Sequence, residues 1–473
     1  HGDVSKDVLQ SLFKGYLKDE LEIGYVTNGV HYPSWVAPEW KKIHKEYFGD
    51  EFPENQLDFD VWGKIHQVPD KDIWEIRRTL RKKLISYIKQ RFSDNWIKRN
   101  ENPKLITEVM GKLNPDALTI GFARRFATYK RGYLLFRNLE RLAEIVNNPN
   151  RPVQFIFAGK AHPADKAGQD LIKRIIEISK LPEFRGKILF VQNYDINLAK
   201  MLLQGVDVWL NTPTRPLEAS GTSGQKGAMN GTIHFSVLDG WWVEGYKKNA
   251  GWALPAERGY DVQDFQDELD AETIYNILED EIVEAFYDRD KNGVPKQWVD
   301  YIKNTIAEVA PHFTTGRMMD DYIQRYYKPQ YERSKKIKIK DHKWARELAA
   351  WKYKISSVWN SIEVKNIEFS DGITNVMKIG QDYPVSVTLD LKGLDCNEIG
   401  LELVVTENGS DESDFQIVET VDFKVDSCEN KQCCYKLNFH PVHPGSFNYG
   451  IRMFPKNEGL PHRQDFRYIK WLS

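Results

Sequence analysis

Short apolar runs alternate with longer amphipathic stretches between about Asp116 and Trp242. Five of the runs are typical of buried strands: 117–122, 153–158, 188–191, 206–210 and 232–238. Three of the stretches between them carry leucine and isoleucine at helical spacing: 133–147, 165–180 and 198–203. This rhythm predicts a doubly wound α/β domain, in which helices cover both faces of a parallel sheet.

Two other segments, at residues 66–100 and about 262–355, also have helical spacing, and we expect them to form a scaffold around the sheet. From about Trp359 the pattern changes to short alternating strands, typical of a β-sandwich: 382–389, 401–405, 415–425 and 435–439. The sequence therefore predicts two domains. Residues 1–350 form the α/β domain with its flanking helices, and residues 351–473 form a β-sandwich whose role the pattern does not give.

The overall charge is nearly balanced, with 66 Lys and Arg residues against 68 Asp and Glu residues. A formal net charge of −2 argues against a nucleic-acid-binding protein, which needs an excess of positive charge. Spanning a membrane takes about 20 consecutive apolar residues. No run in this sequence approaches that length, so we expect no membrane segment.

The four cysteines lie in the last quarter of the chain: Cys396, Cys428, Cys433 and Cys434. They lack the paired CxxC spacing of a zinc site and do not suggest a disulfide framework. We therefore expect reduced thiols, no metal site and a cytoplasmic protein. The chain starts at His1 with a polar stretch that is no signal peptide, and we expect it to be part of a larger protein.

Cationic residues follow the predicted strands. Arg124 and Arg125 come after the first strand, Lys130 lies about one turn further on, and Lys160 follows the second strand. Because the carboxyl ends of parallel strands meet at one edge of a sheet, we expect these groups to lie near one another. Such an edge suits an anionic ligand such as phosphate.

The segment from Glu218 to Gly227 is rich in glycine and small residues, and so exposes backbone N–H groups that can cradle an anion. Gly221 and Gly224 do not fit the GxxxxGK[ST] pattern of a P-loop. Lys226 could instead carry a Schiff base to a carbonyl cofactor whose phosphate the loop holds. From the residues alone, a plain glycine-rich turn with a surface lysine is an open alternative.

Six sequence blocks, taken together and in this order, resemble the α-glucan phosphorylases. They are TNGVH at 27–31, GFARRFATYKR at 121–131, AGKAHPAD at 158–165, NYD at 193–195, EASGTSGQKGAMNG at 218–231 and LDGWWVEG at 238–245. Their form is similar to the short branch of the family, which lacks the long regulatory N-terminus of animal enzymes, so allosteric control is not expected. The resemblance covers residues 1–350 and extends to the β-rich tail. It implies the C-terminal half of a two-domain glycosyltransferase architecture.

The resemblance assigns roles to individual positions. It implies that Lys226 forms the Schiff base with pyridoxal 5'-phosphate, with Tyr194 beside the cofactor. The groups that it places around the cofactor's phosphate are Arg124, Thr222 and Ser223. The catalytic set that it implies is Lys226 with the pair that grips substrate phosphate, Arg125 and Lys130. The groups implied to hold glucose hydroxyls are Asn28, Tyr129, Glu218, Ser220 and Gly221. One position departs from the family, because Gln225 stands where methionine is usual.

The implied activity is retaining phosphorolysis of glycogen, starch or maltodextrin to α-glucose 1-phosphate, with α-glucan and inorganic phosphate as partners. A homo-oligomer is compatible with the sequence. We expect the chain to lack the N-terminal catalytic domain and therefore to be inactive in isolation. Two alternatives stay open: a nucleotide-sugar glucosyltransferase similar to glycogen synthase, which needs no pyridoxal phosphate, and a non-catalytic glucan-binding fragment.

Overall fold

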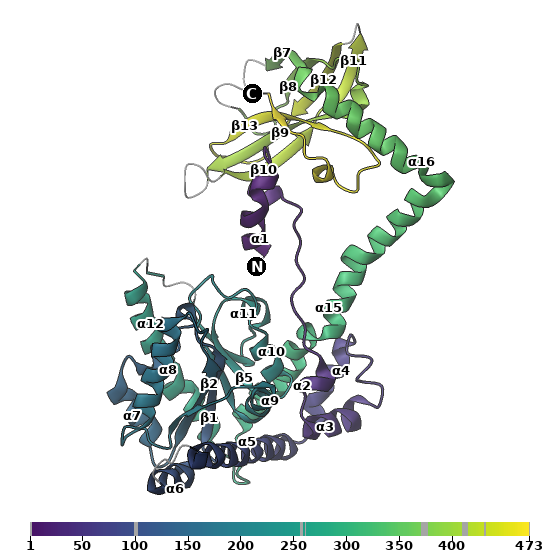
Figure 1. Ribbon diagram of the computed structural model, residues 1–473. Coiled ribbons are helices and arrows are strands. Elements are labelled where there is room, and N and C mark those ends of the chain that lie inside the picture. The colour runs from purple at the N-terminus through teal and green to yellow at the C-terminus, as the bar shows by residue number, and fades with distance from the viewer. Residues whose placement is uncertain are drawn as a thin grey trace. The chain divides into compact units, whose positions relative to one another are not determined.

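The computed structural model describes residues 2–98, 103–255, 259–260, 262–369, 377–408, 415–429 and 432–472. The chain divides into two compact units. One comprises residues 26–323, and the other combines residues 1–25 with 324–473. The elements of both are labelled in Figure 1. The expected domain boundary at residue 350 lies inside helix α16 (Lys328–Val358).

A six-stranded parallel sheet forms the centre of the unit 26–323 (Figure 1). Its strands are β1 (Leu118–Arg125), β2 (Val153–Lys160), β3 (Ile188–Val191), β4 (Val208–Asn211), β5 (Ile233–Val237) and β6 (Gly251–Leu254). The predicted parallel sheet with its helices is therefore confirmed. Strand β6 was not predicted, because four residues that include a glycine and an alanine give too short an apolar pattern.

Helices surround this sheet and connect its strands. Those before the sheet are α2 (Tyr32–Trp35), α3 (Pro38–Phe48), α4 (Phe59–Gly63), α5 (Asp70–Lys98) and α6 (Pro103–Lys112). Those between its strands are α7 (Leu139–Asn147), α8 (Lys166–Ser179), α9 (Ile196–Gly205), α10 (Thr222–Ala228) and α11 (Trp241–Gly245). Those after it are α12 (Gln263–Ile277), α13 (Val283–Tyr287), α14 (Lys296–Asn304) and α15 (Thr315–Tyr322). Side chains of Asn138, Asp165 and Asp195 accept N-cap hydrogen bonds at α7, α8 and α9, which fixes where these helices begin.

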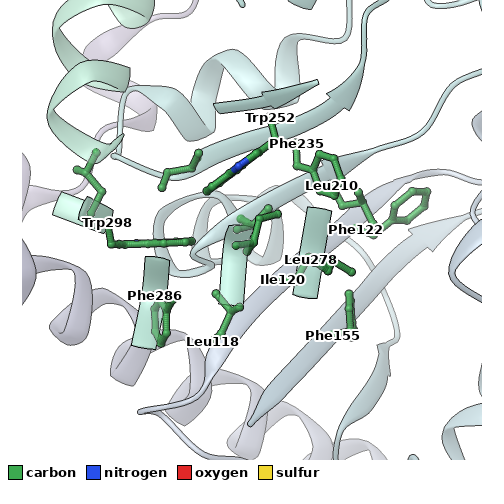
Figure 2. Packing of buried hydrophobic residues seen from close by; sticks show 14 of the residues in the cluster. Leu118, Ile120, Phe122, Phe155, Leu210, Phe235, Trp252, Leu278, Phe286 and Trp298 are labelled. Atoms are coloured by element: carbon green, nitrogen blue, oxygen red, sulfur yellow. The ribbon is translucent and has the colours of Figure 1, made fainter. Parts of the chain in front are cut away.

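Successive residues of the central strands point into two different apolar clusters. Phe155 and Phe157 of β2 belong to the larger cluster, whereas Ile156 and Ala158 belong to another. Figure 2 shows the larger cluster, in which the labelled strand residues such as Leu118 and Phe155 lie in the same core as Leu278, Phe286 and Trp298 of the surrounding helices. A strand whose side chains are buried on both faces must be apolar throughout, which is why the runs are continuous in the sequence.

The strand order is β3-β2-β1-β4-β5-β6. The chain builds the sheet from β1 outward through β2 and β3, and then returns to place β4 on the other side of β1. The strand order thus reverses between β1 and β4. In sheets of this kind, ligands bind beyond the carboxyl ends of the strands at the reversal. The residues that follow β1 and β4 are therefore the first place to look for a site.

The second unit contains the predicted β-sandwich, built from two four-stranded sheets with antiparallel pairing. One sheet has the order β10-β9-β13-β14 and the other β11-β12-β8-β7. The strands are β7 (Glu363–Phe369), β8 (Tyr383–Asp390), β9 (Ile399–Asn408), β10 (Phe415–Asp422), β11 (Lys424–Glu429), β12 (Gln432–Phe439), β13 (Asn448–Pro455) and β14 (Lys470–Trp471). Val387 of one sheet and Leu403 of the other lie in a single core, which Trp351 and Ile355 of α16 complete.

The first residues of the chain belong to this second unit. Helix α1 (Gly2–Leu9) is followed by a segment that bonds to the sandwich through Glu20. Arg452 of β13 is fully buried, and its Nη1 donates to Glu20 Oε1 at 2.6 Å. Across the described helices, none combines the length and the apolar character that crossing a bilayer requires.

Candidate functional site

The carboxyl end of β1 brings two arginines to the edge of the sheet. The strand is buried as far as Ala123, after which Arg124 is partly buried and Arg125 is exposed. Arg124 Nη2 donates to Glu218 Oε2 at 3.0 Å, while Arg124 Nη1 is buried with no hydrogen-bond partner among the described residues. The backbone of Arg125 pairs with β2, but its exposed side chain has no hydrogen-bond or ion-pair partner among the described residues. The edge therefore offers one buried and one exposed guanidinium that can still bind an anion.

Lys130 lies on a short 3₁₀ turn, Thr128–Lys130, just beyond β1. Its side chain is only 7% exposed, with Nζ 4.4 Å from the ring centroid of Tyr129 and paired with Glu218 Oε2. The hydroxyl of Thr212, which follows β4, donates to the carbonyl oxygen of Lys130 at 3.1 Å and fixes the turn. The sheet edge thus holds the lysine in place through both β1 and β4.

Glu218 is the shared partner of both cations. Its carboxylate is 7% exposed and pairs with Arg124 and with Lys130. Burial lowers the pKa of the Arg124 guanidinium, and the Glu218 charge opposes that shift. The trio of Arg124, Lys130 and Glu218 carries one net positive charge, with the buried carboxylate of Asp239 on the far side of the Glu218 backbone. An anion that entered here would find donors already oriented.

The loop that carries Glu218 is fixed by backbone contacts. Glu218 N donates to Asp239 Oδ2 at 2.9 Å, and Asp239 Oδ1 accepts from Gly240 N at 2.8 Å. Asp239 therefore fixes the turn that follows β5. Trp241 N donates to the carbonyl oxygen of Ser220 at 2.8 Å, which ties the middle of the loop to the start of α11.

Glycine is required at two places in this loop. Gly221 has φ +81°, a left-handed conformation that lets helix α10 begin at the next residue. At Gly224, a Cβ atom would lie 2.6 Å from the His234 ring and 2.7 Å from the Trp241 ring. The helix can approach these buried rings only because Gly224 lacks a side chain. The glycine pattern of the sequence is therefore explained by packing as well as by a turn.

Lys226 lies in α10, and its amine is partly buried. Nζ is 3.4 Å from Thr222 Oγ1 and 4.2 Å from the ring centroid of Trp35. Burial lowers the pKa of the Lys226 amine below its usual value. A larger share of a lysine with a lowered pKa is neutral at a given pH, and only the neutral amine can attack a carbonyl. The environment therefore favours Lys226 as a nucleophile.

The other residues assigned to the cofactor lie in α10 and just after β3. Ser223 Oγ accepts from the Trp209 indole Nε1 at 3.1 Å. Tyr194 follows β3, where burial raises the pKa of its phenol and the nearby charge of Arg124 partly opposes the shift. Thr222 opens α10 and approaches Lys226. The structure thus brings the cofactor set into one region around the ends of β1, β3 and β4.

The substrate set is partly brought together. Asn28 Nδ2 donates to Ser220 Oγ at 3.2 Å, although 192 positions separate them in the chain. Arg317 holds this segment, because its Nη2 donates to the carbonyl oxygen of Thr27 at 2.7 Å. Thr27 Oγ1 in turn donates to Glu244 Oε1 at 2.8 Å. Asn28, Ser220, Gly221 and Glu218 therefore line one loop region, with Tyr129 beside Lys130.

Sequence reasoning missed several residues of this region. Trp35 covers the Lys226 amine, and Arg317 positions the Asn28 segment, yet neither lies in a quoted block. Glu244 lies in the block LDGWWVEG, but its partner Thr27 could not be identified without the fold. Gln225 is fully buried, and neither polar atom of its amide is hydrogen-bonded within the described part of the chain. Trp241 and Trp242, in the block LDGWWVEG, are buried and pack in the interior.

These residues fit a carbonyl cofactor that carries a phosphate group. The partly buried amine of Lys226 offers the attachment point. The unpaired Nη1 of Arg124 offers a buried donor for a phosphate oxygen. Thr222 and Ser223, in the first turn of α10, add hydroxyl groups. Lys130 and Arg125 supply further positive charge for a second anion at the same edge.

Sequence comparison matches two family profiles along the chain. The profile of the family described as carbohydrate phosphorylase matches residues 7–347, and that described as the glycogen phosphorylase C-terminal domain matches residues 359–473. The glycogen phosphorylase of Aquifex aeolicus is 45% identical over 327 residues, which cover 69% of this chain and 46% of that protein.

Two further relatives extend the similarity. The glycogen phosphorylase of Mycobacterium tuberculosis is 36% identical over 405 residues, which cover 86% of this chain and 46% of that protein. The maltodextrin phosphorylase of Thermococcus litoralis is 35% identical over 479 residues, which cover 100% of this chain and 55% of that protein. The chain thus spans about half the length of the curated relatives that it matches.

Proposed function

The chain belongs to the carbohydrate phosphorylase family, and we propose that it catalyses the phosphorolysis of an α-1,4-glucan by inorganic phosphate, as a pyridoxal-phosphate-dependent glycosyltransferase. The product is α-glucose 1-phosphate, released with its configuration retained. The proposal is supported by one arrangement above all. Arg124 and Lys130 share the single carboxylate of Glu218, which lies on the same loop as Lys226, and Arg124 keeps a buried Nη1 without a partner among the described residues.

Phosphorolysis exchanges one bond at the terminal glucose. The bond between C1 and the oxygen of the remaining glucan breaks, and a bond between C1 and a phosphate oxygen forms. The proton of the attacking phosphate ends on the glucan oxygen, so the reaction needs no water. Unlike a glycoside hydrolase, such an enzyme does not need a pair of protein carboxylates.

We assign cofactor binding to the residues around α10. When bound, pyridoxal phosphate supplies a phosphate group that can donate and accept a proton next to the substrate phosphate. Lys226 attaches the cofactor through its amine, since burial lowers the pKa of that amine. Arg124 Nη1, together with the hydroxyls of Thr222 and Ser223, holds the phosphate. Tyr194 borders the cofactor from the end of β3.

We assign substrate phosphate to Arg125 and Lys130. Two phosphates held close together repel each other, so cations must surround both. The side chain of Arg125 is exposed and has no partner among the described residues, and it can therefore turn toward an arriving anion. Lys130 is already fixed by Thr212 and Glu218, so we assign it the role of holding the substrate phosphate in one position.

We assign glucose recognition to the residues around Ser220. Asn28 and Ser220 already form a hydrogen bond, and each has further hydrogen-bonding capacity for a sugar hydroxyl. Glu218, Gly221 and Tyr129 border the same loop. Fixing the terminal glucose places its C1 for attack, and such positioning can contribute several kcal/mol to catalysis, up to roughly 7–11 kcal/mol.

The decisive experiment follows the formation of glucose 1-phosphate from maltodextrin, with inorganic phosphate and pyridoxal phosphate each added or omitted. Any turnover should require both. Cofactor attachment without turnover by this chain would match the expectation that catalysis also needs an N-terminal domain. Because the chain spans about half the length of its relatives, cofactor attachment is measured separately by the absorbance spectrum of the purified protein. Glucan extension from a nucleotide sugar without pyridoxal phosphate would instead establish the synthase alternative. Maltodextrin binding with neither attachment nor turnover would establish a binding module.

A further inference from the structure

Three of the four cysteine side chains meet in the β-rich unit. Cys396 opens a 3₁₀ turn, Cys396–Glu398, that precedes β9. Cys428 lies near the end of β11 and Cys433 near the start of β12. Their Sγ atoms all lie within 4.8 Å of one another, and those of Cys428 and Cys433 are 2.6 Å apart. We call these three residues the thiol cluster.

The fold, and not the spacing in the sequence, creates the thiol cluster. Cys428 and Cys433 are direct cross-strand partners in the antiparallel pair β11–β12. Cys396 comes from the connection between β8 and β9. The fold therefore brings the three thiols together without the paired CxxC spacing that the sequence lacks. Cys434 is the next residue on β12 and pairs with Ser427 instead. Because side chains alternate along a strand, Cys434 points to the opposite face and stays outside the cluster.

Contacts within the unit fix the turn that carries Cys396. The side chain of Asp395 caps the turn, since its Oδ1 accepts from Asn397 N at 2.8 Å. Glu398 Oε2 accepts from Asp395 N at 2.8 Å and completes the capping box. The hydroxyl of the buried Tyr435, on β12, donates to the carbonyl oxygen of Cys396 at 2.9 Å. The third thiol is therefore held against the β11–β12 pair by the backbone around it.

We propose that Cys396, Cys428 and Cys433 bind one zinc ion, which links the turn before β9 to the β11–β12 pair. Three thiolates are a soft donor set that suits zinc, and a water molecule can complete the tetrahedron on the exposed side of Cys428. With Zn–S bonds of about 2.3 Å, the sulfur atoms of a tetrahedral site lie about 3.8 Å apart. Cys428 is exposed, so a small rotation of its side chain opens the shorter separation to that value. Binding releases the thiol protons and involves no redox change.

A disulfide between Cys428 and Cys433 is the rival interpretation of the same pair. It would use two of the sulfur atoms and leave the third without a function. The convergence of Cys396 from a separate connection, with its own capping box and its bond from Tyr435, favours a ligand shared by three thiols. The two interpretations make different predictions for the reduced protein, because only the shared site would bind zinc.

The test uses the whole chain, purified in a reductant that does not bind metals. Zinc content is measured by mass spectrometry, and affinity by competition with a chromophoric chelator. Cobalt(II) then replaces zinc, because a tetrahedral thiolate site gives intense visible absorption and sulfur-to-metal charge transfer. We expect one zinc per chain. Replacing a ligand, as in Cys428→Ser, should weaken binding at least about 100-fold, since loss of a group that merely supports a ligand already costs roughly 10–100-fold.

Cys434→Ser is the matched control, because Cys434 adjoins Cys433 on β12 yet lies outside the cluster. It should bind zinc as the unchanged protein does. Cys396→Ser and Cys433→Ser should behave like Cys428→Ser, and circular dichroism of each variant shows whether it folds. The exposed Cys428 keeps the test valid if the buried Cys433 variant does not fold. Failure of the folded, reduced protein to bind zinc, or an equal loss in Cys434→Ser, overturns the proposal. The proposal is also overturned if Cys428 and Cys433 form a disulfide and the reduced protein does not bind zinc.

Discussion

The carboxylate of Glu218 lies against the guanidinium of Arg124, with Oε2 3.0 Å from Nη2, and the same oxygen also pairs with Lys130. Glu218 is thus the internal counter-ion of the two cations that we assign to the cofactor phosphate and the substrate phosphate. An arriving anion must compete with this carboxylate, or share the cations with it. The pairing therefore limits how tightly phosphate binds.

Replacing Glu218 with glutamine removes that competition. We expect Glu218→Gln to lower the KM for inorganic phosphate, because the two cations lose their negative partner. We also expect kcat to fall, since Glu218 is assigned to a glucose hydroxyl. Kinetics with phosphate and glucan varied separately measure both effects. Glu284→Gln, an exposed ion-pair residue on α13, is the control. A KM for phosphate that rises in Glu218→Gln would show that the carboxylate is not a competitor.

Lys226 is predicted to be the attachment point of the cofactor. Lys226→Ala should abolish the covalent label that borohydride reduction leaves after incubation with pyridoxal phosphate. Lys200 is a matched control, because its Nζ lies 5.9 Å from the ring centroid of the same Trp35. Lys200→Ala should keep the label at full yield. Peptide mapping locates the label, and its presence on any lysine other than Lys226 contradicts the assignment.

The rate of cofactor attachment should depend on pH in a specific way. Burial lowers the pKa of Lys226 below 10.5, so its neutral fraction at neutral pH exceeds that of an ordinary lysine. The attachment rate should rise with pH and level off once the pH passes this lowered pKa. Stopped-flow absorbance measures the profile, with free Nα-acetyl-lysine as the reference. A profile that levels off only at the same pH as the reference would show that burial does not lower the pKa of the Lys226 amine.

The sequence predicted those strands of the parallel sheet whose apolar runs are continuous. Residues such as Leu118 and Ile156 are buried on opposite faces, so the whole run is apolar and easy to recognise. Strand β6 was missed because it is short, and β13 was missed because tyrosine, glycine and arginine interrupt its pattern. A strand that is buried on both faces is therefore easier to recognise in the sequence than a short strand or one with polar residues in its pattern.

Pairs between distant residues could not be predicted. The loop around Lys226 was recognised from its residue types, but the pairing of Glu218 with Arg124 and Lys130 depends on how β1 lies beside β4. The thiol cluster likewise depends on the register of β11 with β12. Such contacts require the fold, because a residue type shows what a side chain can bind and not what lies beside it.

Arg125 is predicted to bind substrate phosphate. Arg125→Ala should raise the KM for phosphate far more than the KM for glucan. Charge-assisted contacts of this kind are typically worth on the order of 2–5 kcal/mol. Since Arg125 is exposed, we expect its contact to contribute about 2 kcal/mol, the lower end of that range. The kcat/KM for phosphate should then fall by about 30-fold. Arg174→Ala, on the exposed face of α8, is the control. An unchanged dependence on phosphate would refute the role.

The N-terminal segment should be held to the sandwich chiefly by Glu20. Arg452 is fully buried between Glu20 and Glu402, and Arg463 pairs with both carboxylates. Removing one member of a buried charge network leaves the others uncompensated and typically costs about 3–5 kcal/mol. We expect Arg452→Ala to destabilise the β-rich unit by an amount of this order, measured by denaturant unfolding.

The same network gives a sharper local test. Glu20→Gln leaves Glu402 to neutralise Arg452, so the sandwich should stay folded while residues 1–25 become sensitive to protease. The exposed pair of Lys18 and Asp7 lies on the same segment, and pairs of that kind contribute only about 0–1 kcal/mol. Lys18→Ala should therefore leave protease sensitivity unchanged. Equally slow cleavage of Glu20→Gln and Lys18→Ala would contradict this prediction. It would show that apolar contacts such as that of Tyr16, rather than the buried charges, hold the segment.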